Sequence, residues 1–218
     1  DKKLPIDEVL NKGFTIKNKI EPFTPVTLGI ATNEPAICKF ALNSSMDFNS
    51  MSNSFGENLY VYNHTTLFSL PSELAQEQVL KLTNGGNYQI FVRCQDANGN
   101  ANEKDYYIKF GIKPGPDLTP PKIEVTSIAN NGFVPFNSSS TALTVYANEP
   151  SECKWDATDT DFENMQNNFI CSTKGFNTKS IYYGLYDCST ILEGIKDNQE
   201  NNYYFRCKDQ PNEKDNSK

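Results

Sequence analysis

The stretch "ATNEPAICKF" (31–40) recurs as "YANEPSECKW" (146–155), 115 residues further along the chain. A second stretch, "YQIFVRCQDANGN" (88–100), recurs in shortened form as "YYFRCKDQPN" (203–212). Two separated segments that repeat in the same order indicate two copies of one structural unit. At 218 residues, the chain has room for two domains of about 100 residues each.

The boundary between the two copies falls in a Pro- and Gly-rich stretch, "KPGPDLTPPKI" (113–123). Its prolines predict a stiff linker. The pattern D-x-x-x-P at residues 117–121 matches the same pattern at residues 1–5, at an offset of 116. Each copy therefore begins with the same pattern, and we expect domains at residues 1–116 and 117–218.

Both copies are predicted to be all-β, because short apolar or alternating segments are separated by Gly, Asn and Pro. Residues 71–82 are an exception, since Ser72 is a candidate N-cap for a short helix. In the first copy "DYYIKFGIKP" (105–114) predicts a last strand. No such segment follows the repeat in the second copy, so we expect its last strand to be missing from residues 1–218.

The even number of cysteines predicts a disulfide framework, because no C-x-x-C pair or flanking histidine indicates a zinc site. The repeat sets Cys38 opposite Cys153 and Cys94 opposite Cys207. Of the fifteen complete pairings, this symmetry singles out Cys38–Cys94, Cys153–Cys207 and Cys171–Cys188. A disulfide that closes a loop of about 55 residues, as in the first two of these pairs, stabilises a domain by roughly 4 kcal/mol in the chain-entropy account. Because disulfides persist in oxidising compartments, we expect an extracellular or cell-surface protein.

Two family patterns resemble these copies. "LTNGGNY" (82–88), followed by "FVRCQDANGN", is similar to fibronectin type III domains, in which a tyrosine at the position of Tyr88 forms a tyrosine corner. The paired cysteines resemble the immunoglobulin pattern, which implies a disulfide between the two sheets. The second copy departs from the first pattern, because Asn201 replaces the corner tyrosine and Tyr203 is the substitute candidate. Trp155 also departs from antibody domains, since it lies two residues after Cys153.

The combined pattern N-E-P-x-x-C-K-[FW] … [VF]-R-C-x-D is similar to tandem repeats in surface proteins of archaea and small-genome bacteria. The resemblance implies an all-β fold of two tandem Ig-like or fibronectin type III-like β-sandwich domains, each with an inter-sheet disulfide. It also implies an extracellular structural or adhesive function, as part of a longer repeat chain or filament. The partners we expect are further copies or neighbouring modules of the same chain.

Charge and composition argue against other classes of protein. The net charge is −7 and no basic residues cluster, so we expect no nucleic-acid partner. No run of 18 apolar residues predicts a membrane span. His64 is the only histidine and no G-x-S-x-G motif occurs. We therefore expect no enzyme activity and no catalytic residues.

The acidic stretches "DANGNANEKD" (96–105) and "DATDTDFEN" (156–164) space oxygen ligands as calcium prefers. An EF-hand is excluded, because Gly99 and Tyr107 occupy the wrong loop positions. The linker "DLTPP" resembles calcium-binding linkers of bacterial repeat adhesins, which makes Asp96, Asn98 and Asp117 candidate calcium ligands. The alternative is that these residues only form turns. No other cofactor is expected.

Three N-x-[ST] sequons, at Asn43, Asn63 and Asn137, are candidate glycosylation sites in an extracellular protein. Chance is the alternative in so Asn- and Ser-rich a sequence.

The repeated "NEP" places Glu34 and Glu149 where they could pair with Arg93 and Arg206, respectively. Simple solvation of both carboxylates is the alternative.

A carbohydrate- or ligand-binding accessory module of a secreted enzyme is the second functional hypothesis. It rests on Tyr182 and Tyr183 in the loop "GFNTKSIYYGLY" (175–186), whose rings could stack on sugars. The same rings could instead lie between modules or subunits. Strand donation between subunits is a third hypothesis, which rests on the missing last strand.

Overall fold

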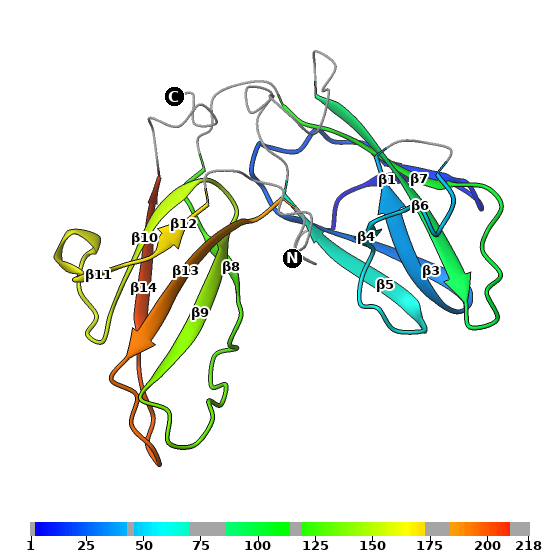
Figure 1. Ribbon diagram of the computed structural model, residues 1–218. Helices are drawn as coiled ribbons and strands as arrows, with labels where there is room; N and C mark the ends of the chain where they lie inside the picture. Colours follow the sequence, from blue (N-terminus) through cyan, green and yellow to red (C-terminus); the bar gives the residue numbers. More distant parts are fainter. Residues whose placement is uncertain (1–2, 43–45, 70–85, 114–118, 173–183, 210–218) are drawn as a thin grey trace. The chain divides into compact units, whose positions relative to one another are not determined.

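The computed structural model describes residues 3–42, 46–69, 86–113, 119–172 and 184–209 (Figure 1). The protein is all-β, as predicted, and the described residues contain no α-helix. Their only helical segment is a 3-10 turn, η1 (Phe162–Asn164). The chain divides into two compact units, here called unit 1 (Asp1–Pro116) and unit 2 (Asp117–Phe176 with Gly184–Lys218). The short helix expected from Ser72 through Leu80 lies outside the described residues.

Unit 1 contains one seven-stranded sheet in the order β1-β2-β7-β6-β3-β4, with β5 also paired to β3. β2 runs parallel to β7, and the other pairs are antiparallel. The strand bounds are β1 (Ile6–Val9), β2 (Gly13–Ile16), β3 (Val26–Ala41), β4 (Asn53–Ser54), β5 (Val61–Phe68), β6 (Asn87–Asp96) and β7 (Tyr106–Gly111). β7 is the strand predicted from the segment that follows the first repeat.

The long strand β3 bends at the "NEP" sequence and so belongs to two parts of the sheet. Residues 26–31 pair with β5, whereas residues 36–41 pair with β6. The register shifts between these segments, at Pro35, whose missing N–H cannot continue a ladder. The bend folds the sheet over on itself. As a result, the ring centroid of Phe68 on β5 lies 5.5 Å from that of Phe40 and 6.2 Å from that of Phe110 on β7.

Alternation along β6 and β7 builds the core of unit 1. Ile90, Val92 and Ile108 are completely buried, because every second side chain of a strand points to the same face. Tyr88 is buried as well, and its ring stacks on Phe110 with centroids 5.4 Å apart. The inward faces of these two strands therefore hold the apolar side chains that exclude water from unit 1.

Unit 2 contains two separate sheets, β11-β10-β14 and β12-β13-β9-β8. The bounds are β8 (Ile123–Thr126), β9 (Ser140–Ala147), β10 (Ser151–Asp156), β11 (Asn167–Asn168), β12 (Ile170–Cys171), β13 (Tyr186–Glu193) and β14 (Tyr204–Asp209). Trp155 on β10 is buried, and its Nε1 donates a 3.0 Å hydrogen bond to Thr190 Oγ1 on β13. This bond links the two sheets across the core. Residues 210–218 are not described, so the expected absence of a last strand stays a prediction.

The structure forms the disulfides Cys38–Cys94, Cys153–Cys207 and Cys171–Cys188, which is the pairing that the repeat singles out. The expectation of inter-sheet disulfides was wrong. Each bond joins direct register partners on adjacent antiparallel strands of one sheet. The reason is the position of the bend: Cys38 and Cys153 follow "NEP", and therefore lie on the strand that pairs with the late strand.

Candidate functional site

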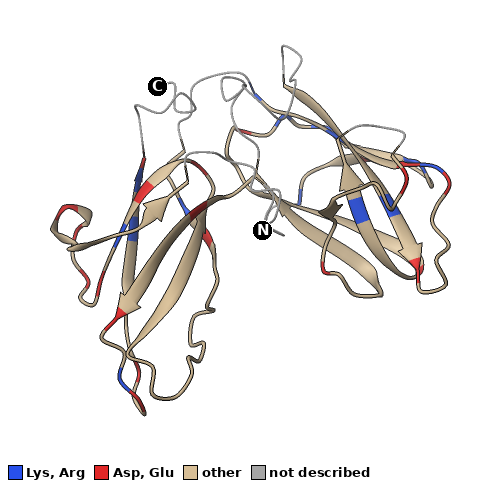
Figure 2. Ribbon diagram, in the orientation of Figure 1, with Lys and Arg blue, Asp and Glu red and all other residues tan. Residues whose placement is uncertain are grey.

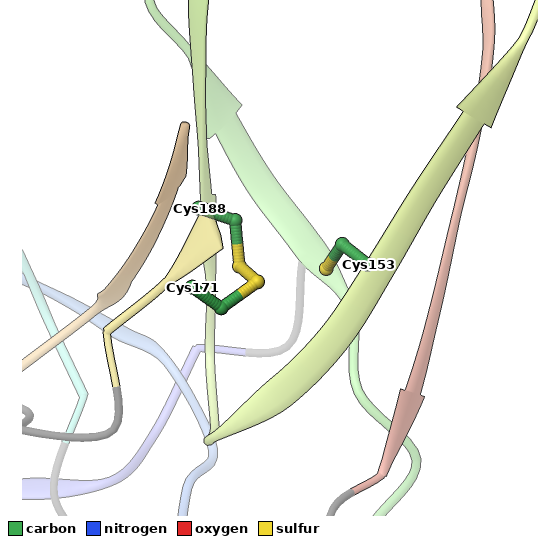
Figure 3. A group of neighbouring side chains, drawn as sticks. All are labelled: Cys153, Cys171 and Cys188. Atoms are coloured by element: carbon green, nitrogen blue, oxygen red, sulfur yellow. A yellow bond between two sulfur atoms is a disulfide. The ribbon is translucent and has the colours of Figure 1, made fainter. Parts of the chain in front are cut away.

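The disulfides of unit 2 face each other in its core. The Sγ atoms of Cys153, Cys171 and Cys188 lie within 4.8 Å of one another (Figure 3). Cys153 belongs to the sheet β11-β10-β14, whereas Cys171 and Cys188 belong to the other sheet. All three sulfur atoms are in disulfides and none is a thiolate, so this cluster offers no ligand set for a soft metal. It serves as packing between the sheets.

Asp96, a candidate calcium ligand, is engaged in a turn. One of its carboxylate oxygens accepts hydrogen bonds from the backbone N–H groups of Asn98 and Asn100, and the other accepts one from the Asn100 side chain. The Asn100 side chain, ahead of the opposing effect of burial, lowers the pKa of Asp96. Gly99 provides the left-handed conformation that this turn requires, with φ of +90°. The turn-forming alternative thus accounts for this carboxylate, and Asp117 lies outside the described residues.

The second acidic stretch contains a similar turn. Asp156 accepts hydrogen bonds from the backbone N–H and hydroxyl of Thr158 and from the N–H of Gln166. The Thr158 backbone bond is the main reason that the pKa of Asp156 is lowered. This carboxylate therefore closes the loop that contains η1.

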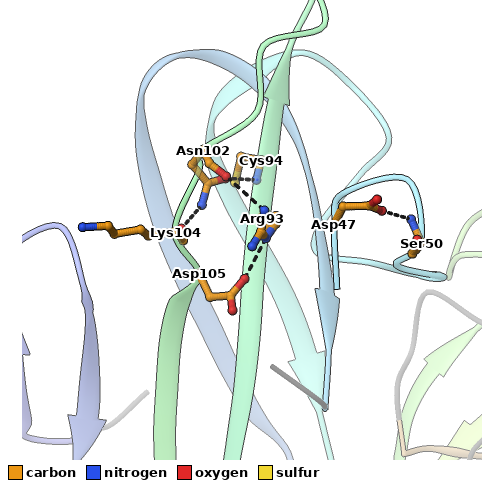
Figure 4. Close-up of polar contacts among 7 residues, drawn as sticks. All are labelled: Asp47, Ser50, Arg93, Cys94, Asn102, Lys104 and Asp105. Carbon is orange, nitrogen blue, oxygen red and sulfur yellow. Dashed lines mark hydrogen bonds and ion pairs between the residues drawn. The ribbon is translucent and has the colours of Figure 1, made fainter. Parts of the chain in front are cut away.

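The repeated arginines pair with acids, but not with those of "NEP". Arg93 Nε lies 2.7 Å from Asp105 Oδ1 (Figure 4), and Arg206 Nη2 lies 2.9 Å from Asp159 Oδ1. The predicted pairs of these arginines with Glu34 and Glu149 were therefore wrong. Glu34 is exposed at the bend of β3, whereas Glu149 is completely buried.

The arginine of unit 1 sits in a network that fixes the turn between β6 and β7. Arg93 and Asp105 are both mostly buried, with 17% of each side chain exposed. Next to them, Asn102 accepts a 2.7 Å hydrogen bond from the backbone N–H of Cys94 and donates to the carbonyl of Lys104 (Figure 4). The network thus anchors the half of β6 that carries the disulfide.

Tyr203, the substitute candidate for the corner, forms a hydrogen bond from its side chain to the backbone, as expected of a residue in that position. Its hydroxyl donates a 2.8 Å hydrogen bond to the Glu193 carbonyl, and its ring meets Trp155 edge-on. Asn201 instead closes the preceding loop through hydrogen bonds with both backbone groups of Lys196. The corner hydrogen bond expected for the hydroxyl of Tyr88 stays a prediction.

Two of the three sequons lie on described, exposed residues. Asn63 is on the outward face of β5, and Asn137 is in the loop before β9, where its N–H donates to Asp197. Asn43 lies outside the described residues, as do Tyr182 and Tyr183. Glycosylation and sugar stacking therefore stay predictions.

His64 is the only histidine in the sequence, and the structure places it in the core of unit 1. Its side chain is 1% exposed, and neither ring nitrogen has a hydrogen-bond partner among the described residues. Burial lowers the pKa of His64, because desolvation disfavours the charged imidazolium.

Unit 1 also contains a groove that the sequence did not predict. It encloses about 1600 Å³ and runs between β1 and β2 on one side and the first half of β3 on the other. Its apolar lining includes Ile6, Phe14, Ile16, Leu28, Ile30 and Val92. The charged residues along it, of both signs, are Lys3, Glu8, Glu34, Asp96 and Lys104. Tyr106 also lines the groove. Its pKa is raised mainly by burial and, to a smaller extent, by the charge of Glu8.

The groove follows an unpaired strand edge. Residues 26–31 of β3 pair with β5 on one edge, and no described strand pairs with the other edge. β1 likewise pairs only with β2 among the described strands, and all four of its residues are exposed. Unpaired backbone N–H and C=O groups beside apolar side chains are the features that bind an extended peptide.

The groove is lined by charged residues of both signs. Figure 2 shows acidic and basic residues interspersed along the ribbon of each unit. No helix in the described part of the chain is long and apolar enough to cross a membrane. The three disulfides indicate an oxidising environment.

No protein-family model matches this chain, and no curated protein matches it either. Its function must therefore be inferred from its sequence and structure.

Proposed function

We propose that this chain is a non-enzymatic, extracellular structural or adhesive surface protein. In this proposal its two units are Ig-like or fibronectin type III-like modules of a longer repeat chain or filament. The observation that carries the proposal is the position of the disulfides. Cys38–Cys94 and Cys153–Cys207 join the same pair of strand positions in the two units.

These disulfides suit a load-bearing role. Each spans more than 50 residues of sequence yet joins residues directly opposite each other in a ladder. Strands in a sheet normally separate by breaking hydrogen bonds that contribute only about 1 kcal/mol each. A covalent bond between neighbouring strands prevents that separation, and it holds the sheet together when tension pulls on the chain.

The described polar groups also support a structural role. Asp96 and Asp156 are used to close turns, and Arg93 and Arg206 fix loops through ion pairs. Each of these groups has a structural hydrogen-bond partner. None of these four side chains converges with another on a reacting position.

Negative-stain electron microscopy of the native, full-length protein released from cells tests this proposal. Fibres or a lattice with a repeat of module size would support it. Dispersed particles that bind a glycan array would overturn it and favour the binding-module hypothesis. Loss of that glycan binding in the Tyr182→Ala/Tyr183→Ala variant would then assign the aromatic loop as the binding site.

A further inference from the structure

The two units differ at one strand position. In unit 2, β9 pairs with β13 on one edge and with β8 on the other. The repeat aligns β9 with the first half of β3, so that Tyr146 corresponds to Ala31. β3 has β5 on the edge that corresponds to β13, but no described strand on the edge that corresponds to β8. A position that is filled in unit 2 is therefore open in unit 1.

The sequence counterpart of β8 is present in unit 1 but pairs elsewhere. The D-x-x-x-P match at offset 116 aligns Glu124 and Val125 of β8 with Glu8 and Val9 of β1. Instead of pairing with β3, β1 forms a hairpin with β2, with Ile6 opposite Ile16 and Val9 opposite Gly13. β1 thus keeps a free outer edge on the far side from β2.

The hairpin prevents β1 from filling the open position in its own unit. Hydrogen bonds from Lys12 N to the Val9 carbonyl and from Lys17 N to the Pro5 carbonyl close both ends of the hairpin. β2 is in turn paired in parallel with β7, with Gly13 opposite Tyr107 and Thr15 opposite Lys109. β1 would have to give up these contacts to pair with β3 of the same chain.

A second copy can reach the same position without that loss. We propose that the groove of unit 1 is a strand-binding site, and that residues 7–10 of a second copy occupy it by pairing with residues 30–32 of β3. This inference rests on the proposed function and names the partner in the assembly. The outer edge of β1 is free while its hairpin stays intact, so the donor keeps its own fold. The register of β8 on β9 places Val9 of the donor opposite Ala31 of the acceptor and Leu10 opposite Ile30.

The side chains of the donor and the groove match in character. Ile6, Val9 and Leu10 are large apolar residues with 43%, 45% and 78% exposure, respectively. Because successive side chains of a strand point to opposite faces, Leu10 would be covered beside Ile30 in the acceptor groove, whereas Val9 would lie on the other face beside Ala31. Covering apolar surface adds to the main-chain hydrogen bonds that strand addition provides.

Site-specific cross-linking between two single-cysteine variants tests this inference. In unit 2, Val125 lies opposite Tyr146, which predicts Val9 of the donor opposite Ala31 of the acceptor. All six native cysteines are in disulfides, so Val9→Cys and Ala31→Cys each introduce the only free thiol. A short bis-maleimide added to a mixture of the two full-length variants then reports their proximity. Mass spectrometry identifies the linked peptides.

The matched control is Thr65→Cys, an exposed residue of β5 on the far side of the β3 ladder. We expect the Val9→Cys and Ala31→Cys mixture to give at least ten times more inter-chain product than Val9→Cys with Thr65→Cys. We also expect an excess of a peptide of residues 4–12 to suppress that product. Equal yields from both mixtures would overturn the proposal. A purely intramolecular product from the Val9→Cys/Ala31→Cys double variant would also overturn it, in favour of closure within one chain.

The proposed function fails on a different result. Fibres in the electron microscope without this cross-link would leave the structural role intact and exclude only this contact. Cross-linking with no ordered assembly would support the strand contact and count against the filament.

Discussion

Removal of the Cys171–Cys188 disulfide gives a quantitative test of the packing in unit 2. The disulfide spans 17 residues of sequence, and a loop of this size stabilises a domain by about 3 kcal/mol through the chain entropy of the unfolded state. The Cys171→Ala/Cys188→Ala variant also loses the sulfur contacts with Cys153, since all three Sγ atoms lie within 4.8 Å. A small gap of this kind costs about 1 kcal/mol more. We expect unit 2 to lose about 4 kcal/mol of its free energy of unfolding.

Trp155 makes this loss measurable in the intact chain. It is the only tryptophan, and it lies in the core of unit 2 beside Cys188 and Leu192. Its fluorescence during urea unfolding therefore reports on unit 2. With a slope of about 2 kcal/mol per M urea, a loss of 4 kcal/mol lowers the transition midpoint by about 2 M.

The Cys38→Ala/Cys94→Ala variant is the matched control, because it removes the disulfide of unit 1. We expect it to leave the Trp155 transition where it is in the parent protein. A shift of less than about 0.5 M in the Cys171→Ala/Cys188→Ala variant would refute the reasoning. It would show that this bond neither constrains the unfolded chain nor packs as described. An equal shift in the control would contradict the division into two units.

Three further predictions concern unit 1. Because the pKa of buried His64 is lowered in the fold, its stabilising contribution should be complete above the unfolded pKa of about 6.5 and should fall as the pH drops below it. NMR titration of this single imidazole should give a pKa below that value, and His64→Leu should remove the loss of unit 1 stability that sets in just below pH 6.5 in calorimetry, leaving the loss at lower pH that comes from carboxylates such as Asp96. Asp105→Asn should cost about 1–3 kcal/mol, because it leaves the mostly buried Arg93 charge without its carboxylate. Faster hydrogen exchange in the β6–β7 turn would report this loss, and unchanged exchange would contradict it. Gly13→Ala should detach the hairpin from β7, since the new Cβ would overlap the Tyr107 carbonyl at a φ of +146°. Loss of amide protection in β1 and β2 is the expected readout, and retained protection would show that the contact is looser than described.

The sequence was sufficient for features that depend on local pattern and on the repeat. Alternating residues predicted the strand at β7, and the repeat symmetry singled out the pairing of Cys38 with Cys94. The turn-forming alternative for Asp96 also followed from composition, because Asp, Asn and Gly adopt such turns regardless of the rest of the fold.

Other features depend on where a strand goes after it bends. The sequence showed that Pro35 interrupts strand pairing, but not that β3 then continues beside β6. That path decides whether Cys38 bridges two sheets or two neighbouring strands. An inter-sheet bond was expected by analogy, and the geometry of the bend excluded it.

The repeat also could not predict which loop residues form ion pairs with the two arginines. Arg93 and Arg206 occupy equivalent positions, yet Asp105 follows β6 whereas Asp159 precedes η1. The loops differ in length between the copies, so equivalent arginines find acids from different segments. An ion pair between residues distant in sequence depends on these loop paths.

The groove was missed for a related reason. β1 and β8 carry similar sequences, and nothing in residues 6–9 indicates that they pair with β2 rather than with β3. The D-x-x-x-P match did signal that a strand should follow residue 5. Only the comparison of the two units shows that one of them leaves its edge open.

Hydrogen exchange of the intact protein tests this central claim, the open edge of β3, most directly. In β9, residues 144–147 have partners on both edges, through β13 and through β8 with Ser127. The corresponding residues 29–32 of β3 have described strand partners only on the β5 side. At a dilution where the protein is monomeric, we expect the amides on the open edge of residues 29–32 to exchange quickly, while those of residues 144–147 stay protected. Equal protection of the two segments under these conditions would contradict the account, because it would show that the edge of β3 is already filled.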